Sequence, residues 1–324
     1  MTLKEQMKTA QSRVLVVCYS QTGQLDGVLA KLVEPLEADP AIEVEWLRLN
    51  PREPYPFPWP FFRFLEEFPE AVQLDPPELE PLNPAPKPGY DLVILGYTVW
   101  FLAPAPPVTA FLQSPEARSV LKDTPVVTVT ACRNMWMTAH ETVGAMVREV
   151  GGRHCDHAAF TDAGSSLASL ITTPRWLLTG RKEAWLGLPP PGVSESDVGE
   201  RAPRLGRALR QALLDESLDG RAAVLHGLAA VEVDEGLVMS ERIGHRSFRI
   251  WSRLLRRAGP RGSRGRRAAI MVYLVFLLLM IVTVVPLSLL MRRLLRPLMG
   301  ARLEALRAYH EQPSGSGRQR IGEV

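Results

Sequence analysis

The sequence predicts an α/β protein in which an open parallel sheet, covered by helices on both faces, precedes a C-terminal transmembrane helix. Short segments rich in Val, Ile and Leu alternate with amphipathic segments of helical period through the first half of the chain. Several expected strands end in turns that contain Ser, Thr, Gly or Asn, at the edge where parallel sheets bind ligands. Residues 268–291 contain no charged side chain.

The expected elements follow one another as βαβ units require. The first strand covers 13–19 because of its continuous Val and Leu run, and the helix over 23–38 carries its leucines on one face. A second strand, 42–49, alternates between apolar and polar residues. Further strands are expected at 90–97, 124–131 and 155–160, with helices at 107–121 and 135–150.

Composition divides the chain into unlike parts. Residues 1–216 carry a net charge of −7, and residues 217–324 carry +10. We expect a cytoplasmic sheet domain (1–216, with a proline- and aromatic-rich insertion at 51–89), a basic juxtamembrane segment (217–267), a transmembrane helix (268–291) and a basic, partly disordered tail (292–324). The first residues lack the apolar core of a signal peptide, and the three cysteines have no CxxC spacing; both features fit a reducing, cytoplasmic environment.

The uncharged stretch 268–291 is long enough to cross a membrane. As a helix it would measure about 36 Å, against roughly 30 Å for the hydrocarbon core of a bilayer. Nine arginines lie between 246 and 267 and five between 292 and 307, so the positive-inside rule puts the N-terminal side in the cytoplasm. Because these arginines adjoin an apolar span, we expect membrane lipid as their partner, and no nucleic acid. The alternative is a buried core helix.

The turn after the first expected strand has the groups that a phosphate needs. Ser20 and Thr22 offer hydroxyls, Gln21 an amide, and Gly23 allows the backbone to turn so that N–H groups converge. The next helix begins at once and adds its positive end. Such a site requires neither a lysine nor a metal. The alternative interpretation is ordinary helix capping.

Two later turns lie at the same edge of the predicted sheet. Trp100 and Phe101 follow one strand and precede a proline-rich turn, which would form a flat apolar wall for a ring system. Arg133 and Asn134 follow the next strand and could meet the edge of that ring. Core packing is the alternative role for Trp100. Because three loops converge at one edge, they indicate a ligand site more strongly than any single motif does.

These motifs resemble those of the flavodoxin superfamily. Ser20-Gln21-Thr22-Gly23-Gln24 matches the phosphate-loop pattern [ST]-x-T-G-x-[TS], and Leu25 departs from it at the last hydroxyl. The segment YDLVILGYTVWFLAPAPPVTAFL resembles the second flavin loop of that superfamily. The resemblance implies strand order 2-1-3-4-5 and FMN as cofactor. The implied FMN-binding residues are Ser20, Gln21, Thr22, Gly23, Gln24 and Leu25 for the phosphate, and Thr98, Val99, Trp100, Phe101, Arg133 and Asn134 for the ring system.

A narrower resemblance covers more of the chain. The segments YSQTGQL, PFPWPFF, PRWLLTGRKE and SERIGHRSFRIW, together with the second flavin loop, are similar to the family named dialkylresorcinol condensing enzymes. That family implies a bacterial inner-membrane protein that aromatises a dialkyl-cyclohexanedione to a dialkylresorcinol. It also implies a ketosynthase or acyl-carrier partner. NAD(P)H as electron donor and a homodimer are further expectations.

The sequence does not identify a catalytic base. His140 and Cys132 lie near the expected site in sequence, but packing is the alternative role for each. His154, Cys155, Asp156 and His157 suggest a metal site, yet side chains along a strand alternate between faces, so we expect no metal there. The aromatic insertion is either a lid over a hydrophobic substrate or a packed structural flap, with a short helix at 61–68.

Three functions follow from these observations. The first is a membrane-anchored, FMN-dependent oxidoreductase acting on a hydrophobic cyclic substrate. The second is an NAD(P)H:quinone-type reductase or a flavodoxin-like electron carrier at the membrane, and the third is a flavin-free membrane scaffold. Smaller expectations concern the C-terminal half: a closing helix at 196–216 capped by Ser196, an undecided segment at 224–243, an amphipathic helix at 248–255 and a tail without fixed structure at 313–320.

Overall fold

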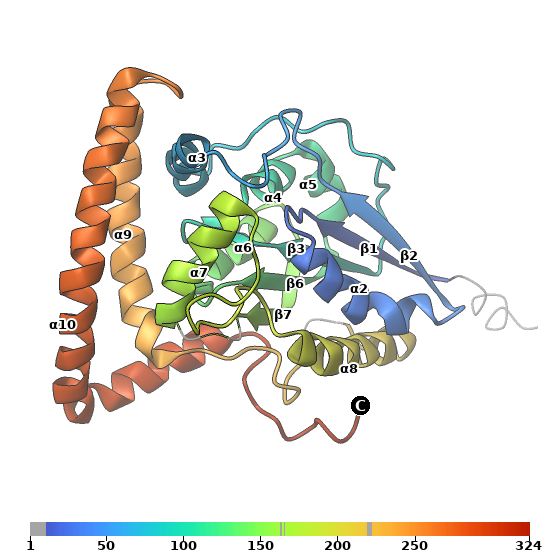
Figure 1. The fold of residues 1–324 in the computed structure, drawn as a ribbon. Coiled ribbons are helices and arrows are strands. Elements are labelled where there is room, and N and C mark those ends of the chain that lie inside the picture. Colours follow the sequence, from blue (N-terminus) through green and yellow to red (C-terminus); the bar gives the residue numbers. More distant parts are fainter. Residues whose placement is uncertain (1–10, 163, 165, 219–221) are drawn as a thin grey trace, which may run out of the picture.

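The core of the computed structural model, which describes residues 11–162, 164, 166–218 and 222–324, is a five-stranded parallel sheet (Figure 1). Residues 1–10, on which the signal-peptide argument rests, lie outside the described range. The strand order is β2-β1-β3-β6-β7, the 2-1-3-4-5 order of flavodoxin-like folds, as predicted. The strands are β1 (Ser12–Cys18), β2 (Ile42–Arg48), β3 (Leu92–Tyr97), β6 (Pro125–Cys132) and β7 (Arg153–Thr161).

Helices cover both faces of this sheet. Val14 and Val16 of β1 pack against α2 (Gln24–Glu37) and α8 (Glu195–Leu214), while Leu15 and Val17 pack on the opposite side. That second side is covered by α4 (Pro106–Leu112), α5 (Pro115–Leu121) and α6 (Met137–Glu149). The sheet is thus buried on both faces, which explains the continuous apolar character of its central strands.

Two helical regions that pack on the sheet differ from the sequence expectation. The helix expected over 107–121 is two helices, α4 and α5. The chain breaks between them because Ser114 caps α5: its hydroxyl accepts a hydrogen bond from the Ala117 N–H group at 3.1 Å. Pro115 then occupies the first position of α5, where its missing N–H group costs nothing. The cap of α8 is Ser194, not Ser196. The Ser194 hydroxyl accepts from the Asp197 N–H group at 3.3 Å.

The remaining elements lie at one end of the sheet. The insertion contains α3 (Phe61–Gln73), five residues longer than expected, and a small hairpin is formed by β4 (Val99–Trp100) and β5 (Ala103–Pro104). Helix α7 (Ser166–Thr179) follows β7, and α9 (Glu235–Arg257) lies beside the long helix α10 (Arg264–Glu311) (Figure 1). Among the described residues, one helical stretch, Arg264–Thr283, is long and apolar enough to cross a membrane; buried helices of soluble proteins can meet the same criterion.

The chain after α10 returns to the sheet. Residues 313–320 were expected to lack fixed structure, but Ser314 is fully buried against β7. Its hydroxyl donates to Asp156 Oδ1 at 2.7 Å and accepts from the His157 N–H group at 2.7 Å. Asp156 also accepts hydrogen bonds from the N–H groups of Val224 and Leu225 at 2.8 and 3.1 Å. One buried carboxylate therefore holds together β7, the 222–234 segment and the tail.

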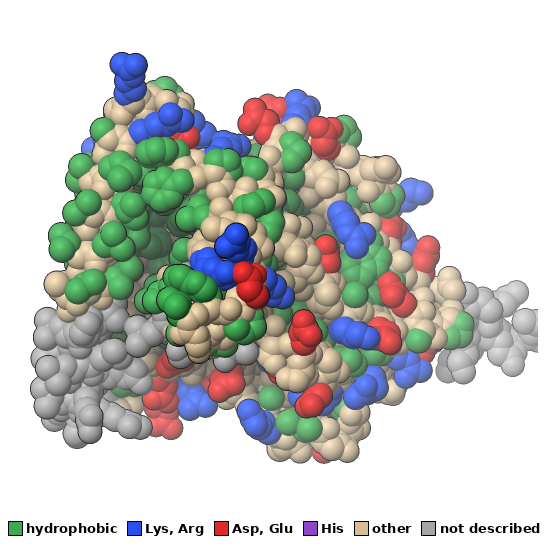
Figure 2. Space-filling model, in the orientation of Figure 1, with side chains coloured by type: hydrophobic (Ala, Val, Ile, Leu, Met, Phe, Trp, Pro, Cys, Tyr) green, Lys and Arg blue, Asp and Glu red, His purple; other side chains and the backbone are tan. Residues whose placement is uncertain are grey.

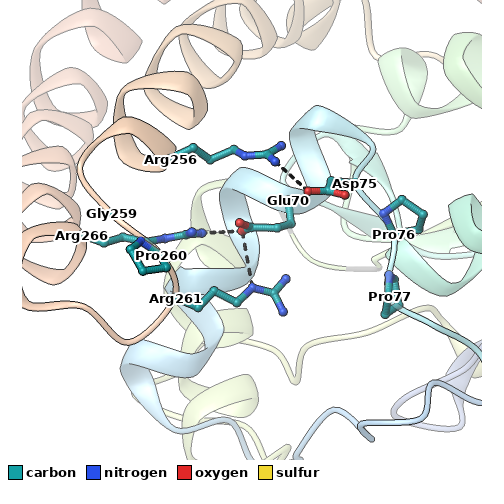
Figure 3. A pocket seen from close by; sticks show the side chains of 9 residues that line it. All are labelled: Glu70, Asp75, Pro76, Pro77, Arg256, Gly259, Pro260, Arg261 and Arg266. Carbon is teal, nitrogen blue, oxygen red and sulfur yellow. Dashed lines mark hydrogen bonds and ion pairs between the residues drawn. The ribbon is translucent and has the colours of Figure 1, made fainter.

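An ion cluster joins α3 to the start of α10. Arg266 is 2% exposed, and its guanidinium pairs with Glu70 and donates to the Glu66 carbonyl oxygen. Arg261 pairs with Glu67 at 2.9 Å, and Arg267 pairs with Glu66 at 3.1 Å. Figure 3 shows two of these arginines converging on Glu70 from the α9–α10 turn. The carboxylates of α3 thus neutralise the arginines that precede the apolar part of α10.

We expect Arg266→Met to lower the free energy of unfolding by about 3 kcal/mol, because it removes the nearest partner of the buried Glu70 carboxylate. Arg256→Met is the matched control. Arg256 pairs with Asp75 at 2.8 Å, but both side chains are about half exposed, so its loss should cost less than ~1 kcal/mol. Urea denaturation of both variants tests this expectation, and equal losses would contradict it.

Buried histidines lie between β6, β7, α6 and the tail. The His140 and His157 rings stack with centroids 3.9 Å apart, and Thr128 Oγ1 lies 2.9 Å from His154 Nε2 and 2.8 Å from His157 Nδ1. Strict alternation along β7 would place His154 and His157 on opposite faces of the sheet. An irregularity in the pairing of β6 with β7 at Val126/Val127 places them together instead. The alternation assumed from the sequence is wrong at this point.

This histidine cluster predicts acid sensitivity. Burial and the neighbouring His154 lower the pKa of His140 to about 3, so the folded chain keeps it neutral where the unfolded chain protonates it. Its stabilising contribution is present above pH 6.5 and is lost as the pH falls toward 3. Relative to His140→Phe, the unmodified chain should lose stability as the pH falls below 6.5, with a slope that approaches about 1.4 kcal/mol per pH unit below about pH 5.5. Urea titrations at several pH values measure this slope; the exposed His226→Asn variant should retain it.

Candidate functional site

The carboxyl ends of β1, β3, β6 and β7 meet at one edge of the sheet, because these strands are parallel. The three loops that the sequence indicated all begin at this edge. A fourth loop, which starts at Asp162 after β7, joins them. The edge contains a topological switch point, since β1 has β2 on one side and β3 on the other. Open α/β sheets bind ligands at such points.

The loop after β1 presents the amino end of α2. Gly23 precedes this helix in the left-handed conformation, with φ of 79°, and has no side chain to cap it. The Ser20 hydroxyl accepts a hydrogen bond from the Asp26 N–H group in the first turn at 3.4 Å. A Cβ atom added at Gly23 would meet nothing within 4 Å, so the space beside it is open. The first N–H groups of a helix have no partner within the helix and carry its positive end. With the half-buried hydroxyls of Ser20 and Thr22, they form a set of donors that fits a phosphate.

The other three residues of this loop have different surroundings. Gln21 Nε2 donates to the Pro56 carbonyl oxygen at 2.9 Å, and its Oε1 accepts from Trp59 Nε1 at 3.1 Å. Gln24 packs against Gly192, where an added Cβ would lie 1.9 Å from Gln24 Nε2. Leu25 is fully buried in the core beneath the sheet. The missing hydroxyl at Leu25 is thus explained by packing, and its contribution to a ligand is limited to its backbone N–H group.

The loop after β3 is a tight hairpin. The Thr98 carbonyl oxygen accepts from the Ala105 N–H group at 2.9 Å, and Val99 pairs with Pro104 across β4 and β5. Phe101 and Leu102 form the turn with φ of 52° and 62°, in the left-handed region that residues other than glycine avoid. Two such residues in succession cost roughly 1–3 kcal/mol each, a strain that concentrates at functional sites. The hairpin holds Trp100 at the sheet edge.

Aromatic side chains of the insertion cover Trp100. The centroid of its ring lies 4.9 Å from the ring centroid of Tyr55, 5.5 Å from that of Trp59 and 6.2 Å from that of Tyr19. Tyr55 and Trp59 are 8% and 3% exposed. The Trp59 N–H group donates to the Leu177 carbonyl oxygen of α7 at 2.8 Å. The insertion is therefore a flap packed against one side of the predicted ring-binding wall, and it leaves Trp100 half-buried.

The loop after β6 places Arg133 beside the end of β7. Arg133 and Asn134 are half-buried, and the Arg133 carbonyl oxygen accepts from the Asp162 N–H group at 2.9 Å. Burial raises the pKa of Asp162 to about 6, against the opposing effects of Arg133 and a hydrogen bond from the Gly192 N–H group. The sequence analysis missed Asp162. The signal that could have identified Asp162 is its position at the carboxyl end of an expected strand.

The two earlier candidates for a catalytic role lie in packed surroundings. His140 is 7% exposed, stacks on His157 and contacts the Gln312 carbonyl oxygen through Nε2 at 3.2 Å. Burial raises the pKa of the Cys132 thiol well above its usual range, so it remains a thiol. Within the described residues, no group of three or more His, Cys, Asp or Glu side chains is arranged to hold a metal ion. These observations favour structural roles for His140 and Cys132.

A pocket of about 530 Å³ lies away from this edge, between α3 and the α9–α10 turn (Figure 3). Its lining includes Arg256, Arg261, Arg266, Glu70 and Asp75. The arginines and carboxylates that face it are paired with one another. We therefore assign this pocket to the ion cluster and retain the carboxyl edge of the sheet as the candidate site.

Comparison with known proteins gives distant structural likeness only. No protein-family model and no curated protein matches the chain. A flavoprotein from Lactobacillus acidophilus NCFM, solved in complex with FMN, is 18% identical, with a TM-score of 0.36, over 46% of this chain and 93% of its own. A flavodoxin from the domain Archaea is 11% identical, with a TM-score of 0.34, over 62% of this chain and 99% of its own. The fold assignment rests on the strand order of the sheet itself.

The hydrogen bonds of Gln21 predict how the flap is held. Gln21→Ala removes both bonds to the insertion and should destabilise the flap by about 2 kcal/mol. We expect residues 50–60 to be cleaved faster in limited proteolysis. Gln11→Ala is the matched control, because Gln11 Nε2 donates to the Pro40 carbonyl oxygen at 2.8 Å far from the flap. Equal cleavage rates in the two variants would show that Gln21 does not hold the flap.

Proposed function

We propose that this protein binds FMN at the carboxyl edge of the sheet and acts as a membrane-attached oxidoreductase on a hydrophobic cyclic substrate. The observation that carries the proposal is the open space at Gly23 before the start of α2, placed at the same edge as the strained hairpin that holds Trp100. Donors for a phosphate and a flat wall for a ring thus occur at one switch point. The flavodoxin-like strand order supports FMN as the ligand.

The residues of the edge have separate tasks in this proposal. Ser20, Thr22, Gly23 and the first N–H groups of α2 hold the phosphate, and the 98–101 hairpin supports the ring system. Bound FMN would supply hydride transfer. Asp162, with its raised pKa, is placed to accept a proton through a carboxylate oxygen near neutral pH. The flap residues Tyr55 and Trp59 exclude water when closed.

The aromatic packing around Trp100 favours an enzyme over an electron carrier. A carrier exposes its flavin edge to a protein partner, whereas here Tyr55 and Trp59 pack against the half-buried Trp100. The same packing is the observation that favours the flavin-free scaffold, since these rings occupy part of the space beside Trp100. We favour the enzyme, because a scaffold has no use for the open space at Gly23.

The substrate proposal follows the sequence resemblance. Aromatising a dialkyl-cyclohexanedione removes one proton and one hydride, which an acid–base residue and a flavin together can accept. A dialkylresorcinol pathway would add a ketosynthase or acyl-carrier partner. A quinone-type reductase would instead draw hydride from NAD(P)H. Both substrates are hydrophobic rings, which suits attachment to a bacterial inner membrane, and a homodimer is compatible with either reaction.

The first test is FMN retention by the full chain in mild detergent. After FMN addition and desalting, we expect a flavin absorbance band at a one-to-one ratio, lost in Thr22→Ala/Gly23→Val because the second change fills and strains the phosphate loop. Gly89→Val is the control, since Gly89 also has a positive φ, of 94°, with open space beside it. A folded chain that retains no flavin would support the scaffold. Retention in both variants would place the flavin elsewhere.

A further inference from the structure

Helix α10 has an inner face that is covered and an outer face that is not. On the inner face, Tyr273 stacks on Phe68 of α3 at 4.8 Å, and Ile270 is fully buried. The outer face consists of apolar side chains three or four residues apart, each 42–70% exposed: Met271, Val272, Val275, Leu278, Leu279 and Val282. This spacing forms one continuous stripe along the helix. Such an apolar stripe on the surface indicates a partner.

Helix α9 adds a second stripe beside the first. Ile243, Ile250 and Leu254 are 46–58% exposed and fall on one helical face. Exposed arginines rim this face: Arg246, Arg249, Arg253 and Arg257. Figure 2 shows the hydrophobic side chains gathered over α10 and α9 on the left of the molecule. An apolar face bordered by arginines is complementary to the acyl layer and the anionic headgroups of a membrane.

Both ends of α10 are fixed to the body that contains the sheet. At its start, Arg266 pairs with Glu70 of α3. At its end, Arg307 pairs with Glu235 at 3.3 Å, and the buried Ser314 bonds Asp156 of β7. Figure 1 shows the last part of α10 bending back beneath the sheet. The tail after the apolar stretch therefore lies on the same body as the segment before it.

Helix α9 is docked along its length as well. Near its start, Glu241 is 1% exposed and accepts from the Thr138 N–H group of α6 at 2.6 Å. Near its end, Ser252 Oγ accepts from Gln73 Nε2 of α3 at 2.5 Å. A perpendicular crossing by α10 would consequently carry α9, with its arginines, and part of the sheet domain into the hydrocarbon core. Charged side chains at that depth are strongly unfavourable.

We infer that α9 and α10 lie in the plane of the membrane, with their outer apolar stripes in one leaflet of an anionic bilayer. The tail 312–324 then stays on the same side as the sheet, in contrast to the single-pass arrangement expected from the sequence. The inference goes beyond the proposed function and shares with it only membrane attachment. Its tests need no flavin, so either can fail alone.

The first test compares two introduced cysteines in sealed inside-out membrane vesicles that carry the full chain. Ala30→Cys marks the sheet domain and Gln319→Cys the tail; both positions are exposed. We expect a membrane-impermeant maleimide to label both to the same extent without detergent. The unmodified chain gives the background, because Cys18 and Cys155 are buried and Cys132 is half-buried. Labelling of Gln319→Cys only after permeabilisation would overturn the inference.

The second test is flotation of the purified full chain with phosphatidylglycerol vesicles. Leu279→Glu, on the outer stripe, should reduce vesicle binding at least tenfold, because it places a charge in the acyl layer. Leu214→Glu is the matched control on α8, where Leu214 is 39% exposed, and it should float like the unmodified chain. Equal flotation of both variants would overturn the inference. So would a stable dimer that fails to float, since the stripe would then be an interface between copies.

Discussion

The arrangement of this protein depends on keeping the apolar part of α10 out of water. Its inner face is covered by aromatic residues of α3 and α9, and Phe68 and Tyr273 stack at the centre of that contact. The arginines before the apolar part would resist burial, so Glu66, Glu67 and Glu70 of α3 neutralise them. Removing hydrophobic surface from water thus explains why an insertion between two strands carries three glutamates on one helix.

The same insertion connects this helix pair to the candidate site. Trp59 contacts Trp100 at one end of the insertion and Phe64 on its other side, with ring centroids 5.7 Å apart. Phe64 contacts Phe101 at 5.0 Å, and Phe101 contacts Phe68 at 5.3 Å. An unbroken series of ring contacts therefore runs from the sheet edge to α10. The inner face of α10 and the half-buried wall of the candidate site are thus connected through aromatic side chains of the insertion.

The sheet could be predicted from the sequence because the signals for strands and helices are local. The central strands β1 and β3 are short apolar runs, β2 alternates between apolar and polar residues, and the buried leucines of α2 fall at helical spacing. The loops of the site followed from topology alone, since parallel strands bring their carboxyl ends together. By contrast, the pairing of Gln21 with the insertion joins residues 35 or more positions apart, and periodicity has no access to such contacts.

The errors of sequence reasoning have the same origin. The irregular pairing of β6 with β7 depends on two strands at once, so the histidines of β7 could not be assigned to one face. The tail 313–320 has the composition of a disordered segment, yet Ser314 is buried because Asp156, far earlier in the chain, accepts its hydroxyl. A stretch of apolar residues likewise shows that a helix avoids water. The contacts at both ends of the helix are needed to decide how it lies relative to the sheet.

Energetics indicate which part of the flap can open. Detaching α3 from α10 would expose the buried side chains of Phe68 and Ile270 to water, at roughly 1.5–3 kcal/mol each, and would separate the ion pair of Arg266 with Glu70. Releasing residues 54–60 breaks the two Gln21 bonds and the bond from Trp59 to Leu177, at about 1 kcal/mol each, together with ring contacts. The segment before α3 is thus the weaker attachment. Its displacement would uncover more of the half-buried Trp100, while α3 remains fixed to α9 and α10.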